Sequence, residues 1–198
     1  LTAFTTTDVL LVKHFFAPST AGLYAGLTIF GKIIFFFSAP IGSVMFPMIV
    51  QKYAKKENYH GDFRLASFLI FLPSFLLTVI FFVDPRLVIN IVVRSREEYL
   101  AGTAYLGLIG VFFSLYSLNF VITSFYLSIQ KTFVYIPILV CALLQGVLIW
   151  IFHSSLLQVY YSSIFTSGLL LAALLLYYLK ISVRSDVLYT KPLTPSTT

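Results

Sequence analysis

Charged residues are scarce in this chain. They make up 10% of its 198 residues, whereas about 25% is usual in a soluble domain, and hydrophobic residues make up 59%. A compact domain of this length has too little interior to bury so much apolar surface. The composition therefore argues against a soluble globular protein. It also argues against a disordered chain, which requires low hydrophobicity and high net charge.

Cysteine and the common catalytic motifs are also lacking. Cys141 is the only cysteine, so no disulfide can form within the chain. Glycine-rich phosphate-binding motifs, C-x-x-C and H-E-x-x-H do not occur. The three histidines lie in separate segments (His14, His60 and His153). We therefore predict no catalytic residue, no metal site and no bound cofactor. We attribute the net charge of +6 to the loops of a membrane protein and not to a nucleic-acid interface.

Six mostly apolar segments approach or exceed the length of about 20 residues that a membrane span needs. They are Leu1–Ala17, Leu23–Val50, Phe63–Val83, Tyr99–Gln130, Phe133–Phe152 and Leu156–Leu179. The first is the weakest because it is short and contains two charges. We predict an all-α polytopic membrane bundle of about six helices over residues 1–180, followed by a polar, disordered tail at 181–198. The first residue is Leu1 and not methionine, which we read as an internal start within a longer chain.

Lysine and arginine predict the orientation, because they gather in cytoplasmic loops. With both ends inside, the inner segments contain eight of them and the outer segments three. The inner set is Lys52, Lys55, Lys56, Arg64, Lys131, Lys180, Arg184 and Lys191; the outer set is Arg86, Arg94 and Arg96. We therefore expect both ends to be cytoplasmic. The apolar core Val88–Val93 of an outer connection is expected in the membrane interface, with Pro85 in the first turn of its helix.

Besides Arg64, at the edge of the third span, three charges fall within the predicted spans. A charge at the bilayer centre costs about 2.5–3.5 kcal/mol, so such residues usually pair or face a wet cavity. Asp8 and Lys32 lie at similar depths if the chain turns near residue 20, and we predict that they form an ion pair or share a polar cavity. Lys13 lies nearer a helix end, from which lysine can reach the interface. The alternatives are a structural clasp for the pair and an interfacial anchor for Lys13.

The other polar and aromatic residues in the spans indicate helix packing and not a catalytic or binding role. Asn119 and Gln145 are expected to form interhelical hydrogen bonds. Aromatic residues near the span ends predict interface belts (Trp150, Tyr160, Tyr161, Tyr177 and Tyr178). Four prolines lie inside spans, where neighbouring helices can satisfy the freed carbonyls (Pro40, Pro47, Pro73 and Pro137). They are either packing kinks or hinges, and Pro40 with Gly42 is the best hinge candidate.

The stretch Asp8–Ile49 resembles the polysaccharide flippases of the multidrug/oligosaccharidyl-lipid/polysaccharide exporter superfamily. It reads DVLLVKHFFAPSTAGLYAGLTIFGKIIFFFSAPIGSVMFPMI. The matching positions are Asp8–Phe15, Ala21–Tyr24, Gly31–Lys32 and Phe46–Pro47, and Glu98–Leu100 with Gly107 and Gly110 is similar to the start of the family's tenth helix. The likeness is good over about Asp8–Ile49, loose from Ile49 to about Gln130, and only hydropathic beyond Gln130. The family has about twice this length, in two six-helix bundles.

The resemblance implies that this chain corresponds to the second bundle, helices seven to twelve, and that its partner would be a missing N-terminal bundle. It implies transport of an oligosaccharide on an undecaprenyl pyrophosphate carrier across the bacterial inner membrane by alternating access, as in O-antigen and other lipopolysaccharide export. Lys13 and Lys32 would attract the pyrophosphate while the lipid tail stays in the membrane. Asp8 would tune Lys32 or take part in proton or sodium coupling.

Three alternatives stay open. A multidrug or cation exporter of the same superfamily would need an acidic site, for which Asp8 is the only acid at membrane depth. A membrane enzyme of lipid-linked sugar metabolism would need a cluster of charges on one aqueous face, which residues 86–98 supply (Arg86, Arg94, Arg96, Glu97 and Glu98). The third alternative is an inactive half-transporter or a membrane scaffold.

Overall fold

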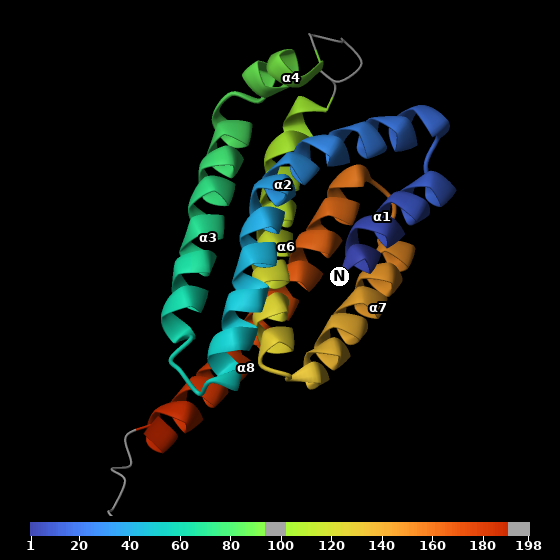
Figure 1. Cartoon of the computed structure of the whole chain (residues 1–198). Helices are drawn as coiled ribbons and strands as arrows, with labels where there is room; N and C mark the ends of the chain where they lie inside the picture. The colour runs from blue at the N-terminus through green and yellow to red at the C-terminus, as the bar shows by residue number, and fades with distance from the viewer. Residues whose placement is uncertain (94–101, 190–198) are drawn as a thin grey trace, which may run out of the picture.

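The computed structural model is helical. It describes residues 1–93 and 102–189 and contains no strand in these ranges. The helices are α1 (Thr2–Phe15), α2 (Pro18–Ala54), α3 (His60–Val83), α4 (Pro85–Val93), α6 (Thr103–Ser128), α7 (Tyr135–Ile151) and α8 (Leu156–Tyr189), with a short 3-10 turn, η1 (Thr132–Val134), before α7. Figure 1 shows the long helices side by side in a bundle and α4 lying across one end of it. The predicted all-α architecture is confirmed.

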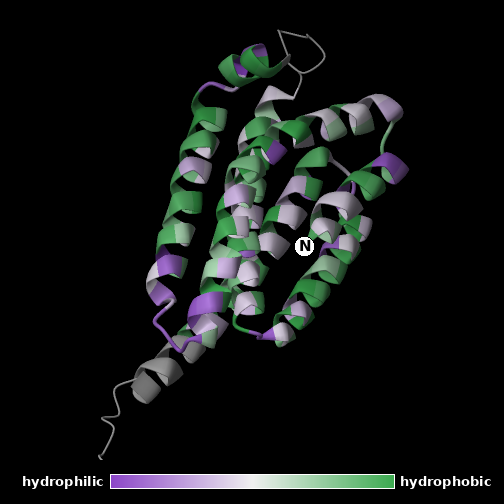
Figure 2. Ribbon diagram, in the orientation of Figure 1, coloured by the Kyte–Doolittle hydropathy of each residue, from purple (hydrophilic) through white to green (hydrophobic). Residues whose placement is uncertain are grey.

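Five helices of the described residues are long and apolar enough to cross a membrane. They are Pro18–Ala54, His60–Val83, Thr103–Ser128, Thr132–Ile151 and Leu156–Leu179. Hydrophobic residues predominate along them, and the hydrophilic ones gather near the ends of the bundle (Figure 2). Many serine and threonine side chains are buried inside the bundle, and many phenylalanine and leucine side chains are exposed on its outside, as expected where lipid is the solvent. The chain is a multi-pass helical membrane protein.

The first predicted span is the short helix α1. Its 14 residues extend over about 21 Å, which is less than the hydrocarbon thickness of about 30 Å. The helix ends because Phe16 is extended and because Ala17 precedes Pro18, which disfavours helical backbone at Ala17. Pro18 then begins α2, at the helix position that proline prefers. The second span therefore begins five residues before the predicted Leu23.

Helix α8 continues to Tyr189, through residues 181–189 of the predicted tail, and disorder of the tail stays a prediction. This part of the sequence contains neither glycine nor proline, so no residue in it removes a backbone hydrogen bond or loosens the helix. The first proline that follows is Pro192. Residues 190–198 lie outside the described ranges. The same is true of Tyr99, where the fourth span was predicted to begin, and of the charged residues Arg94, Arg96, Glu97 and Glu98.

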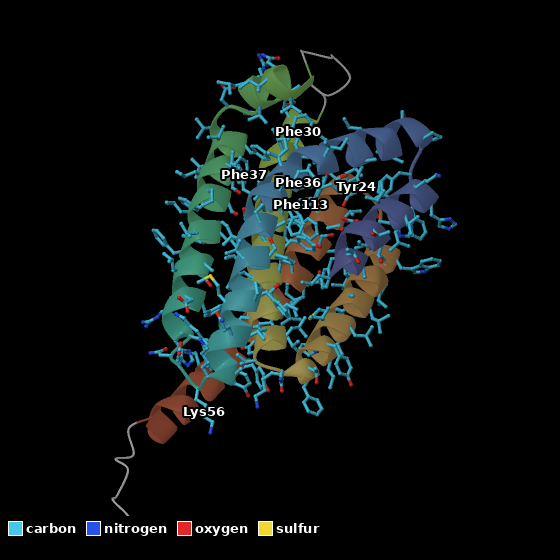
Figure 3. The ribbon with its side chains drawn as sticks, viewed as in Figure 1. Tyr24, Phe30, Phe36, Phe37, Lys56 and Phe113 are labelled. Atoms are coloured by element: carbon cyan, nitrogen blue, oxygen red, sulfur yellow. The ribbon has the colours of Figure 1, made fainter. Side chains whose placement is uncertain are left out.

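Helix α6 is the centre of the bundle. It packs against α2, α3 and α8, and most of its side chains are buried. Glycines bring it close to its neighbours: a Cβ atom on Gly31 of α2 would collide with the ring of Phe113 on α6, and one on Gly107 of α6 would collide with the ring of Phe82 on α3. Figure 3 shows Phe113 beside the first part of α2. The bundle is therefore organised by close approach of three backbones.

The two ends of the bundle differ in charge. The α2–α3 and α6–α7 connections and the end of α8 lie at one end, and α4 with the α1–α2 and α7–α8 connections lies at the other (Figure 1). The first end contains Lys52, Lys55, Lys56, Arg64 and Lys131, whereas the described cation of the α3–α6 connection at the second end is Arg86. The loop cations that the sequence assigned to one side of the membrane thus meet at one end of the bundle.

Helices α2 and α6 end in the same Schellman motif. At the end of α2, the N–H of Glu57 donates to the Lys52 carbonyl at 2.9 Å and the N–H of Lys56 donates to the Tyr53 carbonyl at 3.1 Å. Lys56 has a φ of 59° and Gln130, at the equivalent position after α6, has a φ of 60°. Glycine is the usual residue here because it adopts positive φ without a steric penalty.

Helix α4 begins with a side-chain cap. The N–H of Leu87 donates to Oδ1 of Asp84 at 2.9 Å, and Pro85 is the first residue of the helix. Val88 and Ile89 are buried against the bundle, whereas Ile91 is exposed. The predicted short helix with Pro85 in its first turn is confirmed, and its place in the membrane interface stays a prediction.

The glycines of α2 offer a matched test of the α2–α6 packing. Gly31→Ala is expected to lower the free energy of unfolding by about 1–3 kcal/mol, because the new methyl group displaces Phe113. Gly22→Ala adds the same methyl group where no atom lies within 4 Å, so stability should stay within about 1 kcal/mol of wild type. Thermal unfolding in detergent, followed by helical circular dichroism, measures both. Equal stability of the two variants would contradict the close approach.

Candidate functional site

Asp8 is the one buried charged side chain in the described residues. Its exposed fraction is 1%, and both of its carboxyl oxygens accept hydrogen bonds. The hydroxyl of Tyr24 donates to Oδ2 at 2.8 Å, and the backbone N–H of Val9 donates to Oδ1 at 2.7 Å. The bond to Tyr24 joins α1 to the first part of α2, where Figure 3 labels this tyrosine. The carboxyl group therefore has a protein partner at each of its oxygens.

Two further helices meet beside this carboxyl group. The ring of Tyr24 stacks on Tyr160 of α8 with centroids 5.0 Å apart, and Tyr160 lies 5.6 Å from the ring of Tyr105 on α6. The Tyr160 hydroxyl is buried and has no hydrogen-bond partner among the described residues. Residues from α1, α2, α6 and α8 thus enclose one carboxyl group and one unpaired hydroxyl. This cluster lies where the first hairpin meets α6 and α8.

The predicted ion pair between Asp8 and Lys32 is not formed. Lys32 is exposed on α2, and although its charge acts on Asp8, the one ion pair among the described residues lies elsewhere, between Lys52 and Asp62. The reason is register. Because α1 ends at Phe15 and α2 begins at Pro18, residues at equal depth have numbers summing to about 33 and not 40. The turn of α2 that contains Tyr24 therefore lies opposite Asp8.

Lys13 lies in the last turn of α1 and is exposed. The next residue, His14, stacks on Trp150 of α7, and Phe15 stacks on His153 with ring centroids 4.0 Å apart. Lys13 therefore lies at the edge of an aromatic cluster where α1, α7 and the α7–α8 connection meet. The predicted site residues are thus in three environments: Asp8 is buried, Lys32 is exposed on a spanning helix, and Lys13 is exposed at a helix end.

The interhelical hydrogen bonds predicted for two amides are confirmed. The Asn119 amide of α6 donates to the Ser167 carbonyl of α8 at 2.9 Å. The Gln145 amide of α7 donates to the Phe4 carbonyl of α1 at 3.1 Å and to the Ser163 hydroxyl of α8 at 3.0 Å. Gln145 therefore holds α1 against two other helices, which fixes the position of Asp8.

Sequence reasoning missed both tyrosines of the Asp8 cluster. Tyr24 was part of the family-like stretch, but no role was expected for its hydroxyl. Tyr160 was assigned to an interface belt together with Tyr161, yet Tyr160 is buried and Tyr161 is 60% exposed. A neighbouring pair on a helix points in directions about 100° apart, so one member can face the core and the other the lipid. The helical periodicity of buried serines and threonines along α8 was the available signal (Ser163, Thr166, Ser167).

The predicted hinge lies in a bent but continuous helix. Figure 1 shows α2 changing direction between the part beside α1 and the part beside α3. Pro40 lies within the helix and cannot donate to the Phe36 carbonyl, which is a usual cause of such bends. Gly42 is buried, and a Cβ atom there would lie 2.5 Å from the ring of Phe120 on α6. Gly42 thus allows close packing, and a hinge movement at Pro40 stays a prediction.

A double-mutant cycle tests the bond between Asp8 and Tyr24. Tyr24→Phe should lower the free energy of unfolding by about 1–3 kcal/mol, because it leaves a buried carboxyl oxygen without its donor. In an Asp8→Ala background the same change should cost much less. Tyr161→Phe, on the exposed face of α8, is the control and should change stability by about 0.5 kcal/mol or less. Equal costs in both backgrounds, measured by unfolding in detergent, would show that the hydrogen bond contributes nothing.

Comparisons of the chain with protein-family models, with curated proteins and with solved structures found no match. The family resemblance therefore depends on the residues of the stretch Asp8–Ile49.

Proposed function

We propose that this chain belongs to a transporter that moves an anionic, lipid-linked oligosaccharide across a bacterial inner membrane by alternating access. The observation that supports the proposal best is the position of Lys32. This lysine is exposed on the spanning helix α2 and forms no ion pair with the described residues. The family resemblance of the surrounding stretch supplies the class of substrate.

An exposed lysine within a spanning helix needs a partner outside the bundle. A charge in the hydrocarbon costs about 2.5–3.5 kcal/mol unless water or an opposite charge meets it. Asp8 does not supply that charge directly, because it forms no ion pair with Lys32 among the described residues. Lys32 is therefore available to an anion such as the pyrophosphate of a lipid carrier.

The neighbours of Lys32 suit an amphiphilic ligand. Ile29 and Phe36, three residues before and four residues after it, lie on the same face of α2 and are 55% and 66% exposed. A pyrophosphate at Lys32 would thus have apolar surface beside it for the first part of a prenyl chain. Lys13, at the exposed end of α1, would add a second cation on the route of the anion.

The Asp8 cluster would give this half of the transporter its rigidity. Rocking of one bundle against another requires that each bundle moves as a unit. The bond from Tyr24 to Asp8 and the bonds of Gln145 join α1 to α2, α7 and α8. In this proposal the lysine-rich end of the bundle faces the cytoplasm, in accord with the distribution of loop cations. A first bundle would supply the opposite wall of the path.

Export of an organic cation is the second candidate, and the buried carboxyl group of Asp8 is the observation that favours it. Such a transporter would depend on Asp8 and tolerate the loss of Lys32. Transport of an anion would show the reverse dependence on Lys32.

Binding of defined lipids by the purified chain tests the proposal. Undecaprenyl pyrophosphate should bind more tightly than undecaprenol, and Lys32→Gln should weaken that binding at least about tenfold, which corresponds to about 1.4 kcal/mol. Lys32→Arg should retain most of the affinity because it keeps the charge. Lys131→Gln removes a lysine from the α6–α7 connection and is the matched control.

In proteoliposomes that also contain the first bundle, the same variants should affect the translocation of a fluorescent, pyrophosphate-linked saccharide in the same order. Equal binding of the charged and neutral lipids, or a Lys32→Gln variant with wild-type affinity, would contradict the assignment of an anionic substrate.

A further inference from the structure

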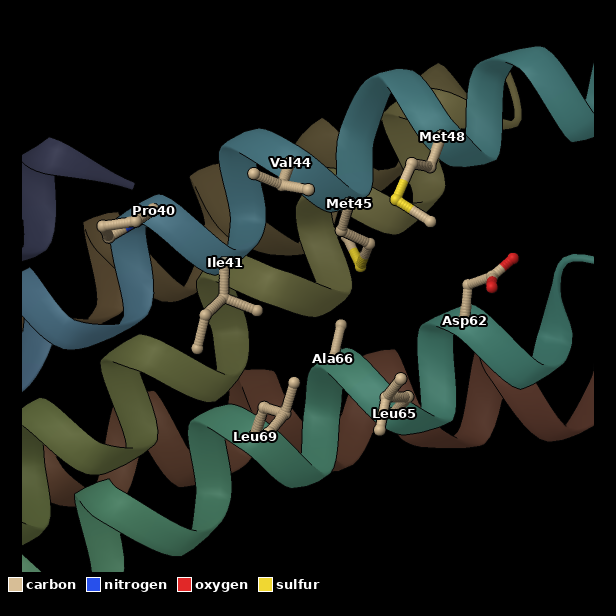
Figure 4. Close-up of a pocket in the computed structure, with 9 residues that line it drawn as sticks. All are labelled: Pro40, Ile41, Val44, Met45, Met48, Asp62, Leu65, Ala66 and Leu69. Carbon is tan, nitrogen blue, oxygen red and sulfur yellow. The ribbon is translucent and has the colours of Figure 1, made fainter.

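A groove runs between α2 and α3, and its lining does not include the proposed transport residues. It has a volume of about 380 Å³. Figure 4 shows the side chains that line it, which come from both helices: Pro40, Ile41, Val44, Met45, Met48, Asp62, Leu65, Ala66 and Leu69. All of them except Asp62 are apolar. The groove therefore has a long apolar part and one polar end.

The apolar part opens to the outside of the bundle. Val44 and Leu65, on its two walls, are 62% and 59% exposed, and both belong to membrane-spanning helices. A hydrocarbon chain is the occupant that this environment favours, because the groove opens within the part of the protein that lipid surrounds.

The polar end of the groove is cationic. Lys52 lies one helical turn beyond Met48, and its amino group is 2.6 Å from Oδ2 of Asp62. This ion pair neutralises the acid that lines the groove. The following residues, Lys55 and Lys56, are exposed and form no ion pair with any described residue. Glu57 is the remaining acid of this connection, so an approaching headgroup meets a net positive charge.

Lys56, in the connection that follows α2, has a left-handed backbone conformation. Its φ of 59° is one that glycine adopts freely and that a residue with a Cβ atom adopts with strain. Figure 3 labels Lys56 at the end of α2, beyond the bundle. Glycine would fit this position without strain, so Lys56 can be exchanged for glycine without disturbing the backbone.

We propose that the α2–α3 groove binds an anionic phospholipid, with an acyl chain along the apolar part and the phosphate at Lys55 and Lys56. Basic pockets between spanning helices at the cytoplasmic side are the known setting for such headgroups. The apolar length and the charge at one end fit the two parts of one ligand. This binding site is separate from Lys32 and would exist whether or not the chain is a flippase.

Native mass spectrometry of the whole chain in detergent tests the proposal with two lipids of identical acyl chains. Phosphatidylglycerol should bind several-fold more tightly than phosphatidylcholine. Lys56→Gly should weaken phosphatidylglycerol binding about fivefold, the usual effect of one cation near an anionic headgroup, and leave phosphatidylcholine binding unchanged. Leu65→Trp, which fills the groove without altering charge, should weaken the binding of both lipids.

Gln130→Gly is the matched control for Lys56→Gly. Both substitutions put glycine at the left-handed position of the same motif, at the same end of the bundle, so both variants should be at least as stable as wild type. Only Lys56→Gly removes a cation. Equal affinity of the wild-type chain for the two lipids would overturn the proposal. It would also be overturned if Lys56→Gly kept the full preference for phosphatidylglycerol, or if Gln130→Gly lost as much of it.

Discussion

The close approach of α6 to α2 and α3 is the constraint on which the rest of the structure depends. In lipid there is no hydrophobic force between helices, so association comes from close packing and interhelical hydrogen bonds. Gly31 and Gly107 provide the packing, because each leaves room for a phenylalanine ring of the neighbouring helix. Asn119 then bonds α6 to α8 on the side away from α3. The outer helices are arranged around this centre.

The polar groups of the interior follow the same rule. Asp8 and Gln145 are both buried, and each is hydrogen-bonded to a second helix. Lys32 differs, since it remains exposed on a helix that spans the membrane. Buried polar groups that are satisfied within the bundle support its architecture, whereas an exposed charge indicates a partner outside it. This difference separates the residues that hold the structure together from those proposed to bind substrate.

The general architecture could be predicted from the sequence, because apolar runs of about 20 residues determine the spans directly. The bonds of Asn119 and Gln145 were predictable for a related reason: a lone amide in lipid has few choices of partner. The partner of Asp8 could not be predicted, because it depends on where α2 begins. Because α1 ends two residues earlier and α2 begins five residues earlier than predicted, Tyr24 and not Lys32 lies opposite Asp8. Residues 181–189 contain no helix-breaking residue, so α8 continues through them despite their polar composition.

The length of α8 has a mechanical consequence. The helix continues about 15 Å beyond Leu179, the last residue of its apolar span. Just before that point it is fastened to two other helices, by the Tyr126 hydroxyl to the Leu174 carbonyl at 2.7 Å and by Tyr178 to His60 at 3.2 Å. A continuous helix that is anchored near Leu179 moves as a rigid rod. Any tilt of the bundle in the membrane is therefore transmitted to the end of α8 as a larger sideways displacement.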